Sequence, residues 1–250
     1  MADERDLAAV RADIDAIDRE IQALINRRAR CAQRVAEIKL AEQRAARAAG
    51  EGDGEAVFYR PEREAQVLAR IIERNEGPLP AENVAYIFRE LMSACLALEQ
   101  PLQVAYLGPE GTFTQAAALK HFGHGAVCVP RPTIDAVFSQ VASGSCHYGV
   151  VPVENSTEGM VSHTLDSFLD SPVRIAGEVE MGIAHHLLVA PGTRPESLVR
   201  ICAHQQALAQ CRSWLDRHWP ELERQAVASN GEAARRAAAE PGVAAVAGAM

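Results

Sequence analysis

The sequence lacks any long apolar run. Nowhere do the roughly 18 to 20 uncharged apolar residues of a membrane-spanning helix follow one another. The opening MADERDLAAV also contains no apolar core of the kind that an export signal requires. We therefore expect a cytoplasmic protein that does not bind a membrane.

An excess of positive charge is also missing. The formal net charge is −8 and the pI is about 5.5, which argue against a general nucleic-acid binder. An anionic ligand then needs a local cationic cluster. Such a cluster is present at Arg27, Arg28, Arg30 and Arg34.

Metal-ligand spacing is absent from the cysteines. The six cysteines form no C-x-x-C pair and do not cluster with histidine, so reduced and mostly buried thiols are the default. We expect no metal and no cofactor. Aromatic residues make up only 5% of the 250 residues and alanine is abundant, which favours helix-rich packing in a chain long enough for two domains.

A heptad pattern is the strongest feature that is present. It lies on a predicted long helix at residues 6–49, and apolar residues recur there at alternating steps of three and four. One position of this seam is an arginine, which costs several kcal/mol unless an anion or a hydrogen-bond partner meets it. The seam comprises Leu7, Val10, Ile14, Ile17, Ile21, Leu24, Arg28, Cys31, Val35 and Ile38.

Two further cations lie beside the seam. Arg11 and Lys39 share a heptad position because four whole heptads separate them. At 1.5 Å per residue, Arg28 stands about 16 Å from Lys39 and about 25 Å from Arg11. Arg28 and Lys39 can bracket a small anion, whereas Arg11 reaches only the equivalent anion on an antiparallel partner chain, which predicts a homodimer with shared sites. The alternative is that these cations are solvated or salt-bridged, or that Arg28 fixes coiled-coil register.

The rest of the chain divides into helices and then alternating strands and helices. Two shorter helices are predicted, one from residue 61 to the break at 77–80 and one at 81–99. An α/β pattern follows. Its predicted strands are 103–108, 126–131, 147–153, 173–179, 186–189, 198–202 and 225–229, and its predicted helices are 115–122, 133–143, 160–169, 205–218 and 231–239.

Three stretches of the α/β part carry a family resemblance. QVAYLGPEGTFTQAA at 103–117, GVVPVENSTEGMV at 149–161 and ICAHQQALAQC at 201–211 resemble segments of prephenate dehydratases. Upstream, the three-helix plan with its three cations resembles the all-helical chorismate mutase domain that is fused to prephenate dehydratase in bacterial bifunctional proteins of phenylalanine synthesis.

This resemblance implies two domains. Residues 1–100 would be an all-α, three-helix chorismate mutase domain that forms an intertwined dimer. Residues 101–250 would be an α/β, two-lobed prephenate dehydratase domain like periplasmic binding proteins. We expect this second domain to be incomplete, without its C-terminal return and without the ACT regulatory domain, because the segment 242–250 begins another strand-helix unit and then stops.

The resemblance assigns roles in the mutase, with chorismate and prephenate as its small-molecule partners. Arg28 and the partner chain's Arg11 would hold the carboxylates, and Lys39 would contact the breaking ether oxygen. The reaction is a pericyclic shift that needs no nucleophile or metal, so the protein positions the substrate and stabilises developing charge. Glu99 can help at the ether oxygen only when it is protonated, unless it is simply a solvated helix-end residue. Arg63 and Glu64 match an Arg-Glu pair of the family, whereas Cys95 stands where the family often has serine and Arg60 where some relatives have an acidic residue.

The dehydratase residues come from two loops. The run Asn155, Ser156 and Thr157 offers hydroxyls, an amide and N–H groups, although these three residues can equally be helix caps. The turn that ends at Thr112 is similar. The family's acid, the threonine of a T-R-F motif, would lie beyond Met250, so we expect mutase activity with little or no dehydratase activity. Two other hypotheses stay open. One is a non-catalytic solute-binding module, although the lack of an export signal argues against it. The other is a helical dimerisation adaptor in which Arg28 is salt-bridged.

Overall fold

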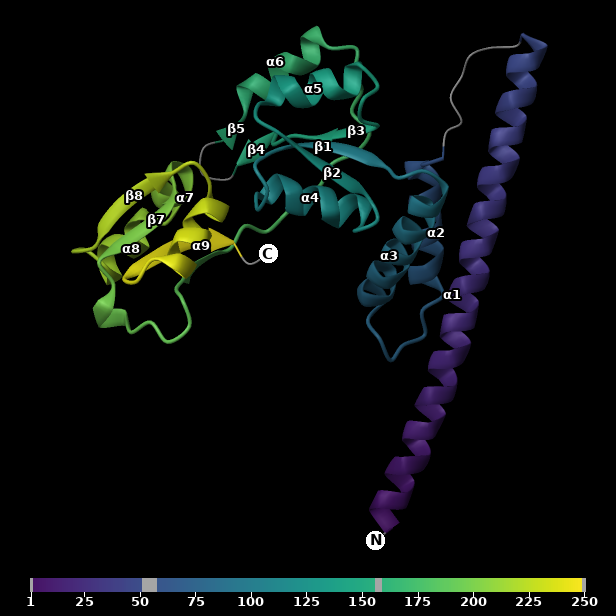
Figure 1. Cartoon of the computed structure of the whole chain (residues 1–250), viewed down its shortest axis with the longest axis horizontal. Helices are drawn as coiled ribbons and strands as arrows, with labels where there is room; N and C mark the ends of the chain where they lie inside the picture. The colour runs from purple at the N-terminus through teal and green to yellow at the C-terminus, as the bar shows by residue number, and fades with distance from the viewer. Residues whose placement is uncertain (1, 51–57, 156–158, 249–250) are drawn as a thin grey trace. The chain divides into compact units, whose positions relative to one another are not determined.

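The computed structural model describes residues 2–50, 58–155 and 159–248, with only the backbone described for residues 2–6. These residues form two compact units (Figure 1). The helical unit comprises Met1–Leu102 together with Phe122–Ala126, and the α/β unit comprises Gln103–His121 and Val127–Met250.

The helical unit contains the three predicted helices. They are α1 (Ala2–Ala49), α2 (Pro61–Glu73) and α3 (Ala81–Glu99). Helix α1 ends where Gly50 adopts a φ of 73° and its N–H bonds to the carbonyl of Arg47, a conformation that glycine takes at little cost. Helix α2 begins at a proline, whose missing N–H would have no partner at that position.

The three helices bury a small core and leave the seam of α1 uncovered. Helix α3 packs against both α1 and α2, and the buried apolar residues include Ala36, Leu68, Ile71 and Ala85. Figure 1 shows α1 running well past the ends of α2 and α3. The eight large apolar residues of the seam are between 44% and 61% exposed in a single chain: Leu7, Val10, Ile14, Ile17, Ile21, Leu24, Val35 and Ile38.

The first half of the α/β unit is a parallel three-stranded sheet. Its strand order is β2-β1-β3, and the central strand β1 is fully buried at Val104, Ala105 and Tyr106, as expected for a strand with neighbours on both sides. The side chain of Thr133 caps the helix after β2 by accepting the N–H of Ala136 at 3.1 Å. The elements are β1 (Gln103–Leu107), α4 (Phe113–Phe122), β2 (Val127–Arg131), α5 (Ile134–Ala142) and β3 (Tyr148–Val150).

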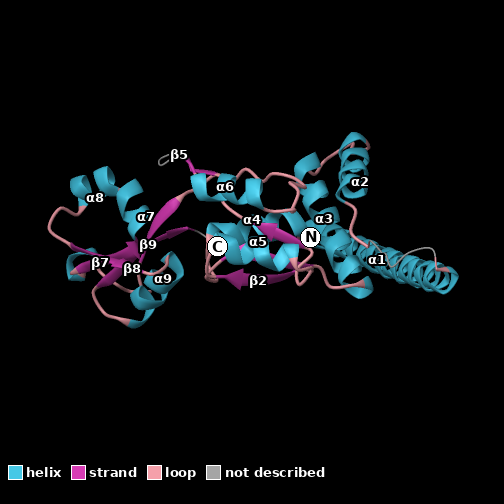
Figure 2. Cartoon of the chain, turned by 90° about the horizontal axis from the view of Figure 1, so that it is seen from above, coloured by secondary structure: helices cyan, strands magenta, loops and turns pink. Residues whose placement is uncertain are grey.

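A hairpin and a second sheet follow. The hairpin pairs β4 with β5, and the four-stranded sheet has the order β6-β9-β7-β8, with β6 antiparallel to β9 and the other pairs parallel. Strands lie only in the α/β unit among the described residues (Figure 2). The elements are β4 (Glu154–Asn155), β5 (Gly159–Met160), α6 (Ser162–Asp170), β6 (His185–Leu188), the 3-10 helix η1 (Pro195–Ser197), β7 (Arg200–His204), α7 (Gln205–Gln210), α8 (Arg212–His218), β8 (Glu223–Val227), α9 (Asn230–Ala239) and β9 (Val243–Gly248).

The second sheet has a core on each face. Successive strand residues point to opposite faces, so Ile201 and Ala203 pack with Leu215 of α8, whereas Cys202 packs with Ala233 and Ala237 of α9. Strand β9 is buried along Val243–Ala247 because it lies between β6 and β7. The segment predicted to start another strand-helix unit is therefore an internal strand of this sheet.

Two predicted elements are wrong. Residues 173–179 form no strand: Ile175 is 72% exposed, so the segment has no buried face that would favour pairing into a sheet. The helix predicted at 205–218 is two helices, α7 and α8, which meet at Cys211. A continuous apolar pattern in the sequence concealed this break.

Candidate active site

The helical unit brings Arg28, Lys39 and Glu99 into one electrostatic environment. Arg28 and Lys39 are both half-buried on α1, and Glu99 lies in the last turn of α3, which packs on α1. Burial raises the pKa of Glu99 above its ordinary value of 4.5, while the charge of Lys39 and then that of Arg28 oppose the rise. The charges of the two cations predicted from the heptad pattern therefore act on the Glu99 carboxyl group, and a shared substrate site stays a prediction.

The direction of this shift decides what Glu99 can do. Burial penalises the charged form of a carboxyl group more than the neutral form. The raised pKa means that the protonated form of Glu99 persists to a higher pH than in an exposed glutamate. A protonated carboxyl group donates a hydrogen bond, so the site can offer both a cation and a neutral donor to one substrate oxygen.

Lys39 has a neighbour that sequence reasoning missed. Its Nζ donates a hydrogen bond of 3.4 Å to the main-chain oxygen of Phe58 and lies 5.4 Å from the centroid of the Phe58 ring. That distance is within the range of a cation–π interaction. The available signal was the adjacent pair Phe58-Tyr59, two aromatic residues directly before α2 in an aromatic-poor chain.

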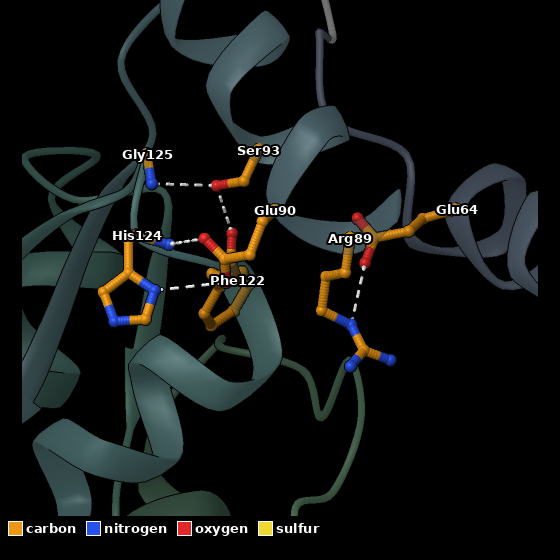
Figure 3. Close-up of polar contacts among 7 residues, drawn as sticks. All are labelled: Glu64, Arg89, Glu90, Ser93, Phe122, His124 and Gly125. Atoms are coloured by element: carbon orange, nitrogen blue, oxygen red, sulfur yellow. Dashed lines mark hydrogen bonds and ion pairs between the residues drawn. The ribbon is translucent and has the colours of Figure 1, made fainter. Parts of the chain in front are cut away.

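The carboxyl group of Glu64 on α2 is also partly buried. Burial raises its pKa, while the charge of Arg89 and a hydrogen bond from Tyr59 oppose the rise. Its Oε1 lies 3.8 Å from Nε of Arg89 on α3 (Figure 3). Arg89 was not among the predicted site residues. Arg60 and Arg63, which were predicted to belong to the same site as Glu64, are exposed.

Of two other predicted site residues, Cys95 is buried and Arg11 is exposed. Cys95 lies on the same helix as Glu99, one turn earlier, and only 4% of its surface is exposed. Arg11 is exposed on α1. It stands 17 residues before Arg28, or about 25 Å along a straight helix.

The last residue of α4 and the segment after it are attached to α3 by four polar contacts (Figure 3). The hydroxyl of Ser93 donates to the carbonyl of Phe122 at 2.7 Å and accepts the N–H of Gly125 at 3.1 Å. One carboxylate oxygen of Glu90 accepts the N–H of His124 at 3.1 Å, and the other lies 3.1 Å from Nδ1 of the same histidine. These contacts hold the part of α3 that leads into Cys95 and Glu99.

Thr112 of the α/β unit acts as a helix cap. Its Oγ1 donates to the carbonyl of Leu107 at 3.1 Å and accepts the N–H of Gln115 at 3.4 Å. The side chain of Gln115 in turn accepts the N–H of Gly111 at 2.7 Å. This reciprocal bonding orders the loop between β1 and α4. Thr112 therefore has a structural role at the start of α4, and a substrate role for it stays a prediction.

Asn155 belongs to a chain of three side chains that sequence reasoning did not find. Nε2 of Gln210 donates to Oδ1 of Asn155 at 3.2 Å, and Oε1 of Gln210 lies 2.7 Å from Nε2 of His185. Because the amide oxygen of Gln210 only accepts, Nε2 of His185 carries the proton. Nδ1 of His185 is buried without a hydrogen-bond partner among the described residues. Ser156 and Thr157 lie outside the described residues.

No group of three or more histidine, cysteine, aspartate or glutamate side chains in the described part of the chain is placed to hold a metal ion. Within that same part, no helix is both long and apolar enough to cross a membrane.

Two family models match the chain. The model described as chorismate mutase type II matches residues 10–100, and the model described as prephenate dehydratase matches residues 104–250. Together these matches cover both units, and the second alone covers more than half of the chain.

Curated relatives carry both names in one protein. The bifunctional chorismate mutase/prephenate dehydratase of Pseudomonas aeruginosa is 57% identical over 250 residues, which is 100% of this chain and 67% of the relative. The protein of the same name from Neisseria gonorrhoeae is 50% identical over 222 residues, covering 89% of this chain and 58% of the relative. The chain thus spans about two thirds of the length of its relative from P. aeruginosa.

A solved structure resembles the second unit. The prephenate dehydratase of Staphylococcus aureus superposes with a TM-score of 0.52 at 27% sequence identity, over 59% of this chain and 55% of that one. This similarity agrees with the α/β architecture of the unit.

Proposed function

The chain belongs to the family of bifunctional chorismate mutase/prephenate dehydratases, enzymes of phenylalanine biosynthesis, and we propose that its helical unit rearranges chorismate to prephenate at Arg28, Lys39 and Glu99. The observation that carries this assignment is the response of Glu99 to its surroundings: burial raises its pKa while Lys39 and Arg28 oppose the rise. A partly buried carboxyl group on which two half-buried cations act electrostatically supports this proposal.

Each group of this site has a separate task in a reaction without a covalent intermediate. The guanidinium of Arg28 grips a carboxylate of the substrate, for which its planar set of donors is suited. The ammonium of Lys39 stabilises negative charge that develops on the ether oxygen. Protonated Glu99 donates a hydrogen bond to that same oxygen. The proposed site also takes in Arg60, Arg63, Glu64 and Cys95, with Glu64 oriented by Arg89.

A second copy of the chain completes the site in this proposal. The exposed apolar seam of α1 is too long for α2 and α3 to cover, and its burial against an equivalent seam would remove apolar surface from water. An antiparallel arrangement also brings the partner's Arg11 to the end of α1 that carries Arg28 and Lys39. We propose that the two chains form an intertwined homodimer with two shared sites.

Mixing two inactive variants tests the function and the sharing together. Arg11→Ala and Arg28→Ala are each expected to lose chorismate turnover. After unfolding and refolding as a mixture, half of the dimers are mixed, and one of their two sites has both arginines intact. Turnover should return to roughly a quarter of the wild-type value, from random pairing in a two-fold dimer.

The outcomes of this experiment are separable. No return of activity from a properly refolded mixture contradicts the shared site. Full wild-type activity in the single Arg28→Ala variant contradicts the mutase site itself. Either variant refolded alone is the control, and it should stay inactive at every concentration.

For the α/β unit, we propose a two-lobed, periplasmic-binding-protein-like domain at residues 101–250 that binds prephenate. Thr112 and Asn155 would lie in its site, together with Ser156 and Thr157, and Gln210 supports Asn155 through its 3.2 Å hydrogen bond. The expectation of little dehydratase activity stays a prediction that an assay for phenylpyruvate tests. The solute-binding and adaptor readings are not favoured, because both family models and both halves of the curated name match this chain.

A further inference from the structure

Phe58 and Tyr59, which lie shortly before α2, each contact one residue of the proposed mutase site. Phe58 meets Lys39 of α1 through its ring and its carbonyl group. Tyr59 meets Glu64 of α2 through a hydrogen bond from its side chain and packs edge-on against Phe122 at a centroid distance of 5.8 Å. Neither aromatic residue belongs to the set expected from the sequence.

We propose that Phe58 is a positioning residue of the mutase, whose ring and carbonyl group hold the ammonium of Lys39 ready for the ether oxygen of chorismate. This inference rests on the proposed mutase function. It adds a residue that acts through Lys39 and does not itself need to touch the substrate.

The two contacts differ in kind, and the difference matters for catalysis. The carbonyl oxygen of Phe58 takes one of the three N–H donors of the Lys39 ammonium. The ring attracts the cation without using a directed hydrogen bond, so the ammonium can move over the ring while it turns a donor toward the substrate. The contact therefore restricts a flexible four-carbon side chain, while the ring itself takes up no N–H donor.

The position of Phe58 also affects the electrostatics of the site. A half-buried ring beside Lys39 replaces water on one side of the ammonium. With less water to screen it, the cation acts more strongly on a nearby developing negative charge. The charge of Lys39 already reaches Glu99, as the opposed rise in the pKa of that carboxyl group shows. The ring thus holds the cation at a place from which it acts on the site.

Stepwise fluorination of this one ring tests the proposal. Phenylalanine with one, two or three ring fluorines is placed at position 58 of the full chain. Fluorine withdraws electron density from the ring face with little change in ring size, so the attraction for the ammonium weakens in steps. We expect kcat for chorismate to fall at each step, by roughly two- to thirtyfold over the series, the range that corresponds to a cation–π interaction. The KM should change little, because Lys39 acts mainly on charge in the transition state.

Two conventional variants keep the test decisive if the trifluorinated chain folds poorly. Phe58→Leu keeps apolar bulk and the main-chain carbonyl but lacks the ring, so its kcat should fall. Phe58→Tyr keeps the ring face and should restore kcat to near the wild-type value. The matched control is the same fluorinated series at Phe88, a half-buried ring of α3, which should leave kcat unchanged.

The proposal and the mutase function fail in different ways. A kcat that stays flat or rises with fluorination overturns the positioning role, since a rise would mean that the ring withholds Lys39 from the substrate. Lys39→Met separates the two levels. If that variant loses turnover while the fluorinated series is flat, the mutase site stands and the inference about Phe58 is wrong. If Lys39→Met keeps full turnover, the proposed role of Lys39 is wrong as well.

Discussion

Ionisation of Glu99 should switch off most of the chorismate rearrangement. Burial raises the pKa of this carboxyl group above 4.5, so its neutral, hydrogen-bond-donating form is present at low pH and is lost as the pH rises through the raised pKa. Loss of one donor to a developing oxyanion costs about 2.7–4 kcal/mol, a factor of about 10² to 10³ in rate. We therefore expect kcat/KM to fall about tenfold per pH unit above the pKa until it reaches the level that Lys39 and Arg28 maintain.

Glu99→Gln isolates this effect. The glutamine amide has nearly the same shape and donates a hydrogen bond at every pH, so the profile of the variant should be flat where the wild type declines. The assay is the initial rate of chorismate depletion from about pH 4 to about pH 9, a range that begins near the ordinary carboxyl pKa and extends well above it. At the upper end of this range the variant should be faster than the wild type, by up to the factor of about 10² that the lost donor represents.

The matched control is Glu82→Gln, the same change at an exposed residue in the first turn of the same helix. Its profile should coincide with that of the wild type. An unchanged decline in Glu99→Gln would refute the donor role. A variant that is inactive at all pH values while folded and dimeric would refute it too, because a neutral donor would then not suffice.

Three further substitutions, one of them with a matched glycine control, test other parts of the structure. Arg28→Ala should lower chorismate turnover at least about 100-fold, the value of a lost charged contact to a carboxylate, while sedimentation still shows a dimer. Gln210→Leu removes one hydrogen bond each from the part-buried side chains of Asn155 and His185 and should reduce the free energy of unfolding by about 1–3 kcal/mol in a urea titration. Gly123→Ala places a Cβ 2.5 Å from the side chain of Ser93, whereas Gly144→Ala, at nearly the same positive φ, meets nothing within 4 Å. Gly123→Ala should therefore be the more destabilising by about 1–3 kcal/mol, and equal midpoints would contradict the close contact.

The helical unit could be predicted well because its signals are local. The proline at 61 and the glycine at 50 mark a helix start and a helix end through their own backbone preferences, and the heptad pattern identifies the face of α1 from spacing alone. The same pattern predicted that Arg28 and Lys39 bracket a small anion. Glu99 required the family resemblance, because nothing in its local sequence distinguishes it from a solvated residue at a helix end.

The residues that were missed depend on contacts between distant segments. Phe58 meets Lys39 across 19 positions and Gln210 meets Asn155 across 55, so no periodicity relates them. Arg89 sits on a helix whose apolar face was predicted, yet its pairing with Glu64 depends on how α2 and α3 pack. The strand predicted at 173–179 fails for the related reason that β propensity cannot supply a neighbouring strand.

The apolar seam of α1 makes catalytic residues and interface residues hard to tell apart by mutation. In the proposed dimer the same helix provides the interface and the site, so a substitution that weakens association also removes the partner's Arg11 from the substrate. Loss of turnover alone then cannot distinguish a catalytic residue from an interface residue. The mixture of Arg11→Ala and Arg28→Ala can do so, because activity returns only if both variants fold, associate and each supply one intact half of a site. A return of about a quarter requires all three conditions at once for a two-fold dimer, and an interface defect in either variant would hold it lower.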